Sequence, residues 1–544
     1  MSFQFFKSFF KIPSKNPRKH LTFQNHPNNQ REGIFPYQLY MVVLRLKPIV
    51  VPHKAYQDFV LEQLRKHYSD GILVLVPKDW PTITKLWITD LSSTTTLLRN
   101  SYSLKGPPPR DPASMLRSYL LLLSTNPAQG ITEWVDQLHR VPLYAILSGF
   151  EPGNVPGVGT FYDFLKRLWG YDTKNIKPNL KHKRLKRKKP KIKKGEKLPP
   201  KNPGIVEKLV NRFFRDGAKK KLLPGDHLFD FFQSGFLDVS AKLGLLGDLD
   251  ALGIVGDGTP IVTARYPRSK RICNCSAQGA ASCNHLRFYS QPDCNSGWDS
   301  SRECYFNGYH LYMLSTSDSF YDLPLYPRLQ PASRHDAVSS VVSTIEFSQR
   351  FTLGTPGKML LDAAHDAESI YGLLNFFKVE PFIDLNGRSK KNYSSEGDIK
   401  ISNTGIPICP ANLMMRQNGF DVSQNRKKWR CPLVSRTGNA CKTPCSTAKY
   451  GRTFHTFLKD NPRIFTKTAR DSDAWKSVYK RRTSVERSNK REKVDYHLEA
   501  GRHRSTQMWY IRTYGIMMCQ HIDAWYSHSK DTIKLEKIIF NTPA

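Results

Sequence analysis

The sequence predicts an α/β protein in which a mixed sheet with flanking helices follows an all-α region. Two observations indicate this order. Capped apolar segments with helical spacing fill residues 110–170. From about residue 250 onward, short strand-like segments alternate with helical ones, which is typical of a sheet covered by helices. With 544 residues, the chain is long enough for two or three domains and a sizeable core.

The charge balance predicts a polyanionic partner. The chain has 83 Lys and Arg against 46 Asp and Glu, a net charge of +37. Such an excess repels itself unless a polyanion neutralises it, and DNA or RNA is the expected one. Charge alone also fits a ribosomal or membrane-surface protein. No apolar run reaches the roughly 18 residues of a membrane helix, and no signal peptide is evident. We therefore expect a cytoplasmic, nucleoid-associated protein without a membrane partner.

Changes in composition divide the chain into five parts. These are a flexible basic arm at 1–36, a helical region at 37–172, a basic linker at 173–204, a sheet-containing domain at 205–530 and a tail at 531–544. Within the helical region, Asp111 and Pro112 predict the start of an apolar helix over Ser114–Leu123. Short capped helices joined by Gly/Pro turns are compatible with a DNA reader and with any small helical bundle.

The linker holds the densest charge of the chain. Lys186, Arg187, Lys188 and Lys189 are consecutive in it and belong to a longer basic run that is interrupted by prolines. Such a charged run cannot pack into a core. Such a segment can lie along a DNA backbone and add affinity without recognising sequence. A solvated linker without specific contacts is the alternative.

The sheet-containing domain is predicted from its alternation of strands and helices. The expected elements are a strand at Ala251–Val255 that breaks at Gly256–Pro260 and resumes at Ile261, a strand at Gly308–Ser315, a helix at Ala337–Phe351 capped by Asp336, a strand at Lys358–Leu361, a helix at Ala367–Phe377 and a strand at Phe382–Leu385. This is the ribonuclease-H-like order, and it places Asp257 and Asp362 where buried strands end.

The stretch 479–493 sets one acid among basic groups. Its Glu, Lys and Arg content without Gly or Pro predicts a helix. Because each residue advances roughly 100° around the axis, Tyr479, Arg482, Glu486 and Lys493 share one narrow face. A solvated basic helix is the alternative.

This spacing resembles the YREK signature of the DDE transposases of bacterial insertion sequences, with every position filled. Residues 117–169, including LSGFEPGNVPGVGTFYDFLKRLWG, resemble the N-terminal domain common in these transposases, and LLDAAHDAESIY resembles their second-acid motif. The resemblance covers about 110–170 and 250–525. It implies a ribonuclease-H-like catalytic domain, a DNA-binding helical region, and Tyr479, Arg482 and Lys493 as contacts to transposon-end DNA.

The resemblance also implies that Asp257, Asp362 and Glu486 form a catalytic triad. Three converging carboxylates repel one another unless cations fill the site. Hard oxygen ligands select Mg²⁺ or Mn²⁺, and two such ions can activate water or a 3′-hydroxyl for strand cleavage and transfer. The alternative is that both aspartates only cap turns. Asp366 is the substitute for the second acid, and we expect His365 to pack or face solvent.

Two groups of cysteines interrupt the simplest family pattern. An insertion at about 386–470 holds Cys409, Cys431, Cys441 and Cys445, which predict a tetrahedral zinc site, with free buried thiols as the alternative. A second group suggests another metal site or a DNA-contacting loop; it comprises Cys273, Cys275, Cys283, Cys294, Cys304 and His285.

The sequence thus predicts a transposase that binds double-stranded transposon ends and target DNA, as a homodimer in a synaptic complex. Its expected chemistry is metal-dependent phosphodiester hydrolysis and strand transfer. Two alternatives stay open: a catalytically inactive DNA-binding or repressor protein derived from a transposase, and a ribonuclease-H-like nuclease without strand transfer.

Overall fold

The computed structural model of the chain describes most of the region that follows the N-terminal arm. The described residues are 47–104, 107–170, 203–218, 225–263, 270–271, 274–275, 277–279, 287–288, 294–387, 398–435, 438–470, 472–501, 503, 505–533, 535 and 539. Several sequence predictions lie outside them: the arm at 1–36, the linker residues Lys186, Arg187, Lys188 and Lys189, and Cys273, Cys283 and His285.

The described N-terminal part is helical. Its α-helices are α2 (His53–Ser69), α3 (Trp80–Ile88), α4 (Ser92–Leu98), α5 (Pro112–Thr125), α6 (Ile131–Arg140), α7 (Pro142–Ser148) and α8 (Val158–Trp169). Helix α5 confirms the predicted apolar helix, because the Asp111 carboxylate accepts hydrogen bonds from the amides of Ala113 and Ser114. Helix α8 ends at Gly170, whose φ of 75° is the left-handed conformation that favours glycine.

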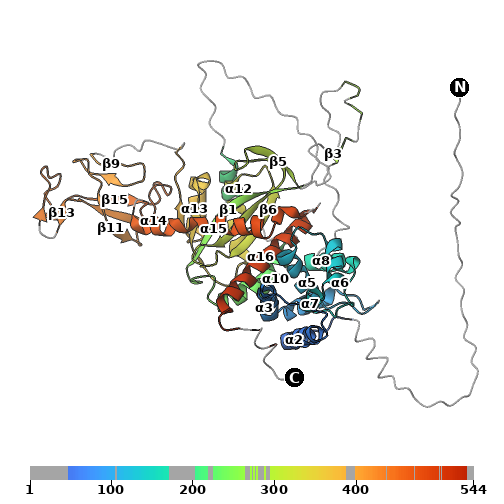
Figure 1. Ribbon diagram of the computed structural model, residues 1–544. Coiled ribbons are helices and arrows are strands. Elements are labelled where there is room, and N and C mark those ends of the chain that lie inside the picture. Colours follow the sequence, from blue (N-terminus) through green and yellow to red (C-terminus); the bar gives the residue numbers. More distant parts are fainter. Residues whose placement is uncertain are drawn as a thin grey trace, which may run out of the picture.

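Six strands form one mixed sheet (Figure 1). They are β1 (Leu252–Val262), β4 (Asn295–Asp299), β5 (Cys304–Thr316), β6 (Pro324–Pro331), β7 (Pro356–Leu361) and β8 (Glu380–Ile383). Strand β5 pairs antiparallel with β1, β4 and β6, whereas β1, β7 and β8 run parallel to one another. A short separate hairpin joins β2 (Lys270–Arg271) to β3 (Arg287–Phe288). The predicted mixed sheet is therefore present.

Strand β1 corrects one prediction from the sequence. The expected break at Gly256–Pro260 does not occur, and Asp257 lies in the middle of an unbroken strand. Strand β5 pairs with β1 from Ile254 to Val262, and β7 pairs with its first half on the other edge. Pairing with β5 along all of 256–260 holds the backbone extended there and overrides the local turn preference of Gly and Asp.

Helices cover the sheet and connect it to the N-terminal helices. These are α9 (Ile205–Asp216), α10 (Asp226–Phe232), α11 (Asp238–Lys242), α12 (Asp336–Arg350), α13 (Glu368–Phe376) and α16 (Thr506–Ser529). Helix α16 packs on β6 and also against α3, α5 and α8, so it lies between the two parts (Figure 1). One continuous apolar core therefore includes residues of both parts. No helix among the described residues is long and apolar enough to cross a membrane.

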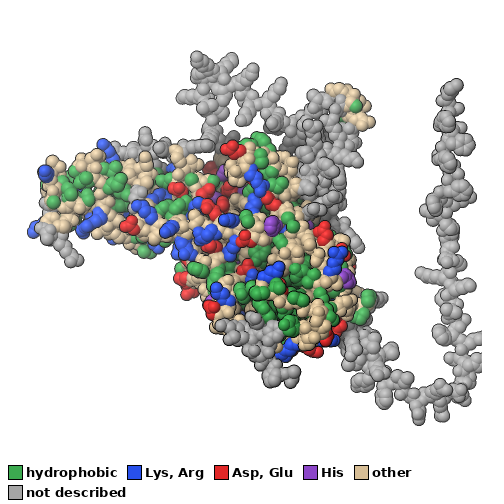
Figure 2. Space-filling view, in the orientation of Figure 1, with side chains coloured by type: hydrophobic (Ala, Val, Ile, Leu, Met, Phe, Trp, Pro, Cys, Tyr) green, Lys and Arg blue, Asp and Glu red, His purple; other side chains and the backbone are tan. Residues whose placement is uncertain are grey.

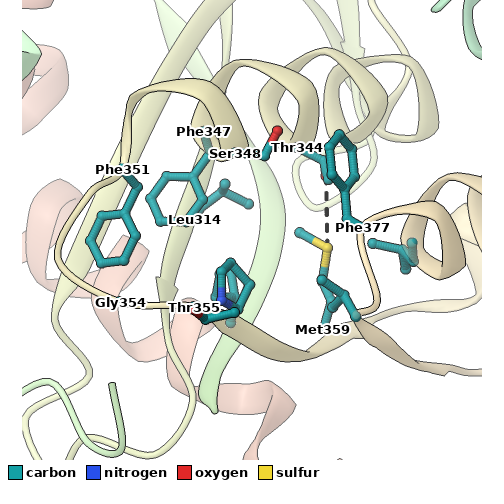
Figure 3. Close-up of a pocket in the computed structure, with 13 residues that line it drawn as sticks. Leu314, Thr344, Phe347, Ser348, Phe351, Gly354, Thr355, Met359 and Phe377 are labelled. Atoms are coloured by element: carbon teal, nitrogen blue, oxygen red, sulfur yellow. Dashed lines mark hydrogen bonds between the residues drawn. The ribbon is translucent and has the colours of Figure 1, made fainter. Parts of the chain in front are cut away.

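An apolar cavity of about 260 Å³ lies between the sheet and the C-terminal half of α12 (Figure 3). Phe347 of α12 and Phe351, the residue that follows the helix, line the cavity. Met359 of β7 accepts a hydrogen bond from Thr344 at 3.7 Å. No charged side chain lines this cavity among the described residues. The cavity is thus a gap in the apolar layer, not a site with catalytic groups.

The basic stretch of the sequence is helical but not one regular α-helix. It comprises α14 (Asp473–Tyr479), a 3₁₀ segment at Lys480–Thr483, α15 (Ser484–Lys490) and a π-helical segment at Arg491–Asp495. The single regular helix predicted over 479–493 is therefore wrong in detail. Because the 3₁₀ and π segments change the turn per residue, the four signature residues do not keep the spacing of an ideal helix.

The cysteine-rich insertion extends from the sheet as a separate group of small sheets (Figure 1). Its strands are β9 (Lys400–Ile401), β10 (Pro407–Ile408), β11 (Arg416–Asp421), β12 (Arg426–Arg430), β13 (Val434–Ser435), β14 (Gly438–Asn439) and β15 (Thr453–Phe457). Strands β11, β12 and β15 form an antiparallel sheet, and the other four pair as two short hairpins.

Candidate active site

Asp257 lies on β1 between two glycines that allow other elements to approach. A Cβ atom on Gly256 would overlap the Tyr312 hydroxyl, and one on Gly258 would overlap Asp336. Burial raises the pKa of Asp257 to about 7, and the neighbouring carboxylates of Asp336 and Asp362 add to this effect. Asp257 is therefore part of a group of carboxylates at the centre of the sheet.

Asp362 follows β7, the parallel neighbour of β1, as the sequence predicted. Its carboxylate accepts a hydrogen bond from the Ala364 amide at 3.1 Å and lies 2.5 Å from Nδ1 of His365. Burial alone would raise the pKa of Asp362, but the hydrogen bond and charge of His365 lower it below its ordinary value. Its strand places Asp362 near Asp257, so the structure brings two of the three predicted acids together.

Glu486 of α15 is held by a basic neighbour. Its carboxylate pairs with the Arg482 guanidinium at 2.7 Å, and nearly half of its side-chain surface is exposed, 48%. Although burial acts to lower the pKa of Arg482, the hydrogen bond and charge of Glu486 and, to a smaller extent, the charge of Asp257 raise it. Among the described residues, no group of three or more His, Cys, Asp or Glu side chains is arranged to hold a metal ion.

The other two signature residues make contacts within the protein. Tyr479 donates a hydrogen bond to the carbonyl of Leu361 at 3.2 Å and stacks on Trp475 with ring centroids 4.4 Å apart. Lys493 lies 3.5 Å from the Glu499 carboxylate. The Tyr479 contact fixes α14 against the residue that precedes Asp362, so the helical stretch and the sheet meet at the carboxylate group.

Four residues at this site were missed or undervalued by the sequence analysis. His365 is fully buried, and its Nε2 lies 3.0 Å from the Tyr312 hydroxyl, so it neither faces solvent nor only packs. Asp336 is the first residue of α12, not its cap; the preceding His335 caps the helix. Nε2 of His310 on β5 lies 2.8 Å from Asp336. The alternation of polar residues at 310 and 312 in an otherwise apolar strand was the available signal.

Asp366, the proposed substitute for the second acid, has a different role. It is fully buried and forms a two-pronged ion pair with Arg463 of the insertion, with contacts of 2.8 and 2.6 Å. It also accepts a hydrogen bond from the Asn386 amide at 2.7 Å. These partners occupy both carboxylate oxygens, so Asp366 anchors the insertion to the body.

The four cysteines of the insertion are thiols, none in a disulfide. Cys409 and Cys431 are buried, and Cys441 and Cys445 are partly buried. Burial raises the pKa of the Cys445 thiol, and the nearby Cys431 and Cys409 thiols add to this effect. Among the described residues, these cysteines do not form a group of three or more side chains arranged to hold a metal ion. In the second cysteine group, Cys294 is buried and Cys304 exposed.

Basic side chains surround this part of the molecule. Figure 2 shows Lys and Arg side chains spread over the visible face of the insertion and onto the region where Figure 1 labels α14 and α15. In strand β12, Arg426 and Lys428 share one acidic partner, Asp421. A basic surface beside a carboxylate site is the electrostatic arrangement expected for contact with a polyanion.

Comparison with known proteins does not assign the chain to a family. No family model matches the sequence, and no curated protein matches it closely enough to indicate a relative. What can be said about function therefore follows from the geometry of the site, the charge of the chain and the sequence signature.

Proposed function

We propose that the protein is a DDE-type DNA transposase with a ribonuclease-H-like catalytic domain. The observation that carries this proposal is the place of the acids. Asp257 lies on β1 and Asp362 follows β7, and these adjacent parallel strands belong to a sheet with the order β4-β5-β1-β7-β8, in which β6 also pairs with β5. Glu486 of α15 pairs with Arg482, on which the charge of Asp257 also acts. The neighbouring positions of Asp257 and Asp362 are what supports the proposal.

Carboxylate oxygens are the ligands that a hard divalent cation prefers. Burial and two further carboxylates raise the pKa of the Asp257 carboxyl. A bound cation would favour the ionised form of Asp257, because its positive charge offsets the repulsion between the carboxylates. Asp257 and Asp362 would hold Mg²⁺ or Mn²⁺, with Glu486 as the third ligand. Two such ions supply the activation of water or a 3′-hydroxyl and the stabilisation of the leaving oxygen.

DNA would complete the site through Arg482. In the protein alone, this guanidinium neutralises Glu486. A phosphate of the transposon end is a suitable competing partner, because guanidinium binds phosphate in a two-pronged geometry. When Arg482 turns to a phosphate, Glu486 is released toward the two aspartates. The helical N-terminal region, the basic linker and Lys493 would supply further contacts to the ends and target. Two copies of the chain would hold the two ends.

The test uses linear labelled duplexes that carry the terminal sequences of the DNA segment encoding the protein. We expect nicking at the end with Mg²⁺ or Mn²⁺ and none with EDTA. Asp257→Asn, Asp362→Asn and Glu486→Gln should each abolish nicking but keep binding. Asp238→Asn, which removes an aspartate paired only with the exposed Lys242, is the matched control and should cleave normally. Equal binding without cleavage by all the proteins would contradict the proposal.

The second candidate function is DNA binding without cleavage. It is favoured by the Arg482–Glu486 pair, which keeps the third acid engaged in the described structure. A nuclease without strand transfer is the remaining alternative. Adding an unlabelled target duplex to the same assay distinguishes a transposase from both alternatives, because only a transposase joins the labelled 3′ end to the target.

We also propose that the four cysteines of the insertion bind zinc. The support is the small separate core of this region, whose six buried members are Ile399, Ile406, Cys409, Met415, Trp429 and Ala469. So few apolar residues are too few to stabilise a unit of this size without a cross-link. The four cysteines are free thiols, and thiolates are ligands that zinc prefers.

A further inference from the structure

The three-stranded sheet of the insertion has two faces of different chemistry. Strand β12 pairs with β11 on one edge and with β15 on the other. Because successive side chains of a strand point to opposite faces, residues 427 and 429 lie on one face of β12, and residues 426, 428 and 430 lie on the other. Trp429 is buried in the small core of the insertion. The face that carries Arg426, Lys428 and Arg430 is therefore turned away from that core.

Cross-strand neighbours extend this second face. Directly paired residues of an antiparallel sheet have their side chains on the same face. Arg416 of β11 is paired with Arg430, and His455 of β15 is paired with Lys428. Four cations thus share one side of the sheet. They are named the outer basic face and comprise Arg416, Arg426, Lys428 and Arg430.

A single carboxylate pairs with the outer basic face. Asp421 of β11 contacts both Arg426 and Lys428, each at 3.3 Å. Within the described parts of the chain, neither Arg416 nor Arg430 has an ion-pair partner. The outer basic face therefore carries an excess of positive charge that the described residues do not neutralise.

This excess charge is unfavourable in the protein alone. Arg416 and Arg430 lie directly opposite each other, and like charges in this arrangement destabilise a sheet. The charges of Arg426 and Lys428 add to burial in lowering the pKa of His455, so they also oppose a further positive charge there. A polyanion that lies over the face would relieve the repulsion. Guanidinium groups in particular bind phosphate in a two-pronged geometry.

The position of the insertion favours DNA as this polyanion. Arg463 of the insertion pairs with Asp366 at 2.6 Å, and Asp366 closely follows the candidate acid Asp362 in the chain. Figure 1 shows the insertion projecting from the body beyond the sheet. Phosphates recur along the whole length of a duplex. A duplex held at the candidate active site can therefore continue onto the insertion.

We propose that the outer basic face binds the phosphate backbone of duplex DNA without reading its sequence. This inference rests on the proposed function, because that function makes DNA the polyanion. It assigns a contact surface to the insertion, separate from the acids and from the signature residues of the helical stretch.

The experiment measures binding of the full chain to a labelled duplex of arbitrary sequence by fluorescence anisotropy, with EDTA present so that no strand is cut. Affinity should fall as salt rises, and each phosphate contact contributes about 0.9 to the slope of log K against log salt concentration. Arg416→Gln/Arg430→Gln should reduce this slope by roughly 1–2, equally for duplexes with and without the terminal sequences. Arg416→Lys/Arg430→Lys keeps both charges and should retain most of the slope.

The matched control is Arg215→Gln/Lys242→Gln. It removes two exposed cations from the body, each paired with one aspartate, and should keep the wild-type slope. Equal reductions in both glutamine variants would mean that only the net charge matters, and would overturn the inference. If thermal unfolding shows that the Arg416/Arg430 variant has lost its fold, Lys428→Gln against Lys242→Gln replaces the comparison, with an expected reduction of about 0.9 for the first alone.

Two further outcomes separate this inference from the proposed function. If Arg416→Gln/Arg430→Gln binds with the wild-type slope while the wild type cuts transposon ends, the outer basic face does not contact DNA and the proposed function stands. If the wild type does not bind any duplex, the proposed function falls together with this inference.

Discussion

The main body and the cysteine-rich insertion are stabilised in different ways. The body has one continuous apolar core that runs from the N-terminal helices through α16 into the sheet. The insertion has six core residues of its own and three small sheets. Its contacts with the body are polar: Arg463 pairs with Asp366, and Arg470 donates to the Ile383 carbonyl and the Tyr371 hydroxyl.

This difference indicates that apolar burial determines the stability of the body, whereas specific cross-links determine that of the insertion. Burial is spread over many residues, so no single contact is essential in a large core. In a small unit, each cross-link makes up a large share of the marginal stability. Perturbations of the two regions should therefore differ in size and in extent.

The largest effect is expected from removing zinc. Structural zinc contributes on the order of 10–16 kcal/mol to the folding of small domains. A strong chelator should therefore make the Lys- and Arg-rich insertion sensitive to trypsin, while the body stays resistant. Metal analysis should find about one zinc per chain, lost in Cys431→Ser.

The control for this prediction is Cys519→Ser. Cys519 is a buried thiol of α16 in the body, whose Sγ contacts the Leu120 carbonyl at 3.6 Å. This variant should keep the zinc. An insertion that resists trypsin equally with and without chelator would show that its stability does not depend on metal.

The second prediction concerns the anchor between the regions. Arg463→Gln leaves the buried Asp366 carboxylate without its cation, and breaking a buried pair in this way costs about 3–5 kcal/mol. Urea unfolding should show this loss. Arg302→Gln removes the more exposed pair with Glu499 at the edge of the body and should cost less than about 1 kcal/mol. Equal losses would mean that the anchor contributes no more than a surface pair.

The third prediction uses pH to separate the regions. Burial raises the pKa of Glu492 in the body to about 8, and the nearby Gln520, Arg491 and Lys493 offset this only in part. Because the unfolded chain loses this proton near pH 4.5, the contribution of Glu492 to stability is fully present below that pH. It is lost as pH rises toward 8, by roughly 1.4 kcal/mol per unit.

Glu492→Gln does not titrate, so its advantage in unfolding free energy over the wild type should grow between pH 5 and pH 8. In the insertion, Asp421 has a lowered pKa, chiefly through its hydrogen bond with Ser423 and then through Lys428. The difference in unfolding free energy between Asp421→Asn and the wild type should therefore be the same at pH 5 and pH 8. If the difference in unfolding free energy between Glu492→Gln and the wild type were the same at both pH values, the pKa of Glu492 would not be raised.

The sequence predicted those elements whose signals are local. The Asp111 cap and the apolar spacing after it identified α5, and the strand ending at Leu361 placed Asp362 correctly. The break expected at Gly256–Pro260 failed because pairing with β5 outweighs turn preference, and such pairing depends on residues far along the chain.

The sequence named candidate acids but not the side chains that contact them. Asp257 and Glu486 could be chosen from spacing and resemblance. The pairing of Arg482 with Glu486 and the approach of Asp336 to Gly258 depend on side-chain positions in three dimensions. His310 and Asp336 are separated by a whole strand, so no local pattern connects them. Tertiary packing determines which residues position or neutralise an acid, so these residues leave only a weak signal in the sequence.

The smallest predicted effect comes from removing one methylene from each of the two cores. Ile254 of β1 and Ile399 of the insertion are both buried, and Ile→Val typically costs 0.5–1.5 kcal/mol at such sites. In the body, the loss should lower the free energy of global unfolding, because the core is continuous. In the insertion, it should appear as faster amide hydrogen exchange in β11, β12 and β15, with global unfolding unchanged, since this unit can open by itself. Equal changes in global unfolding for both variants would show that the insertion and the body unfold together, and that the polar anchor couples the two cores more tightly than their separate packing indicates.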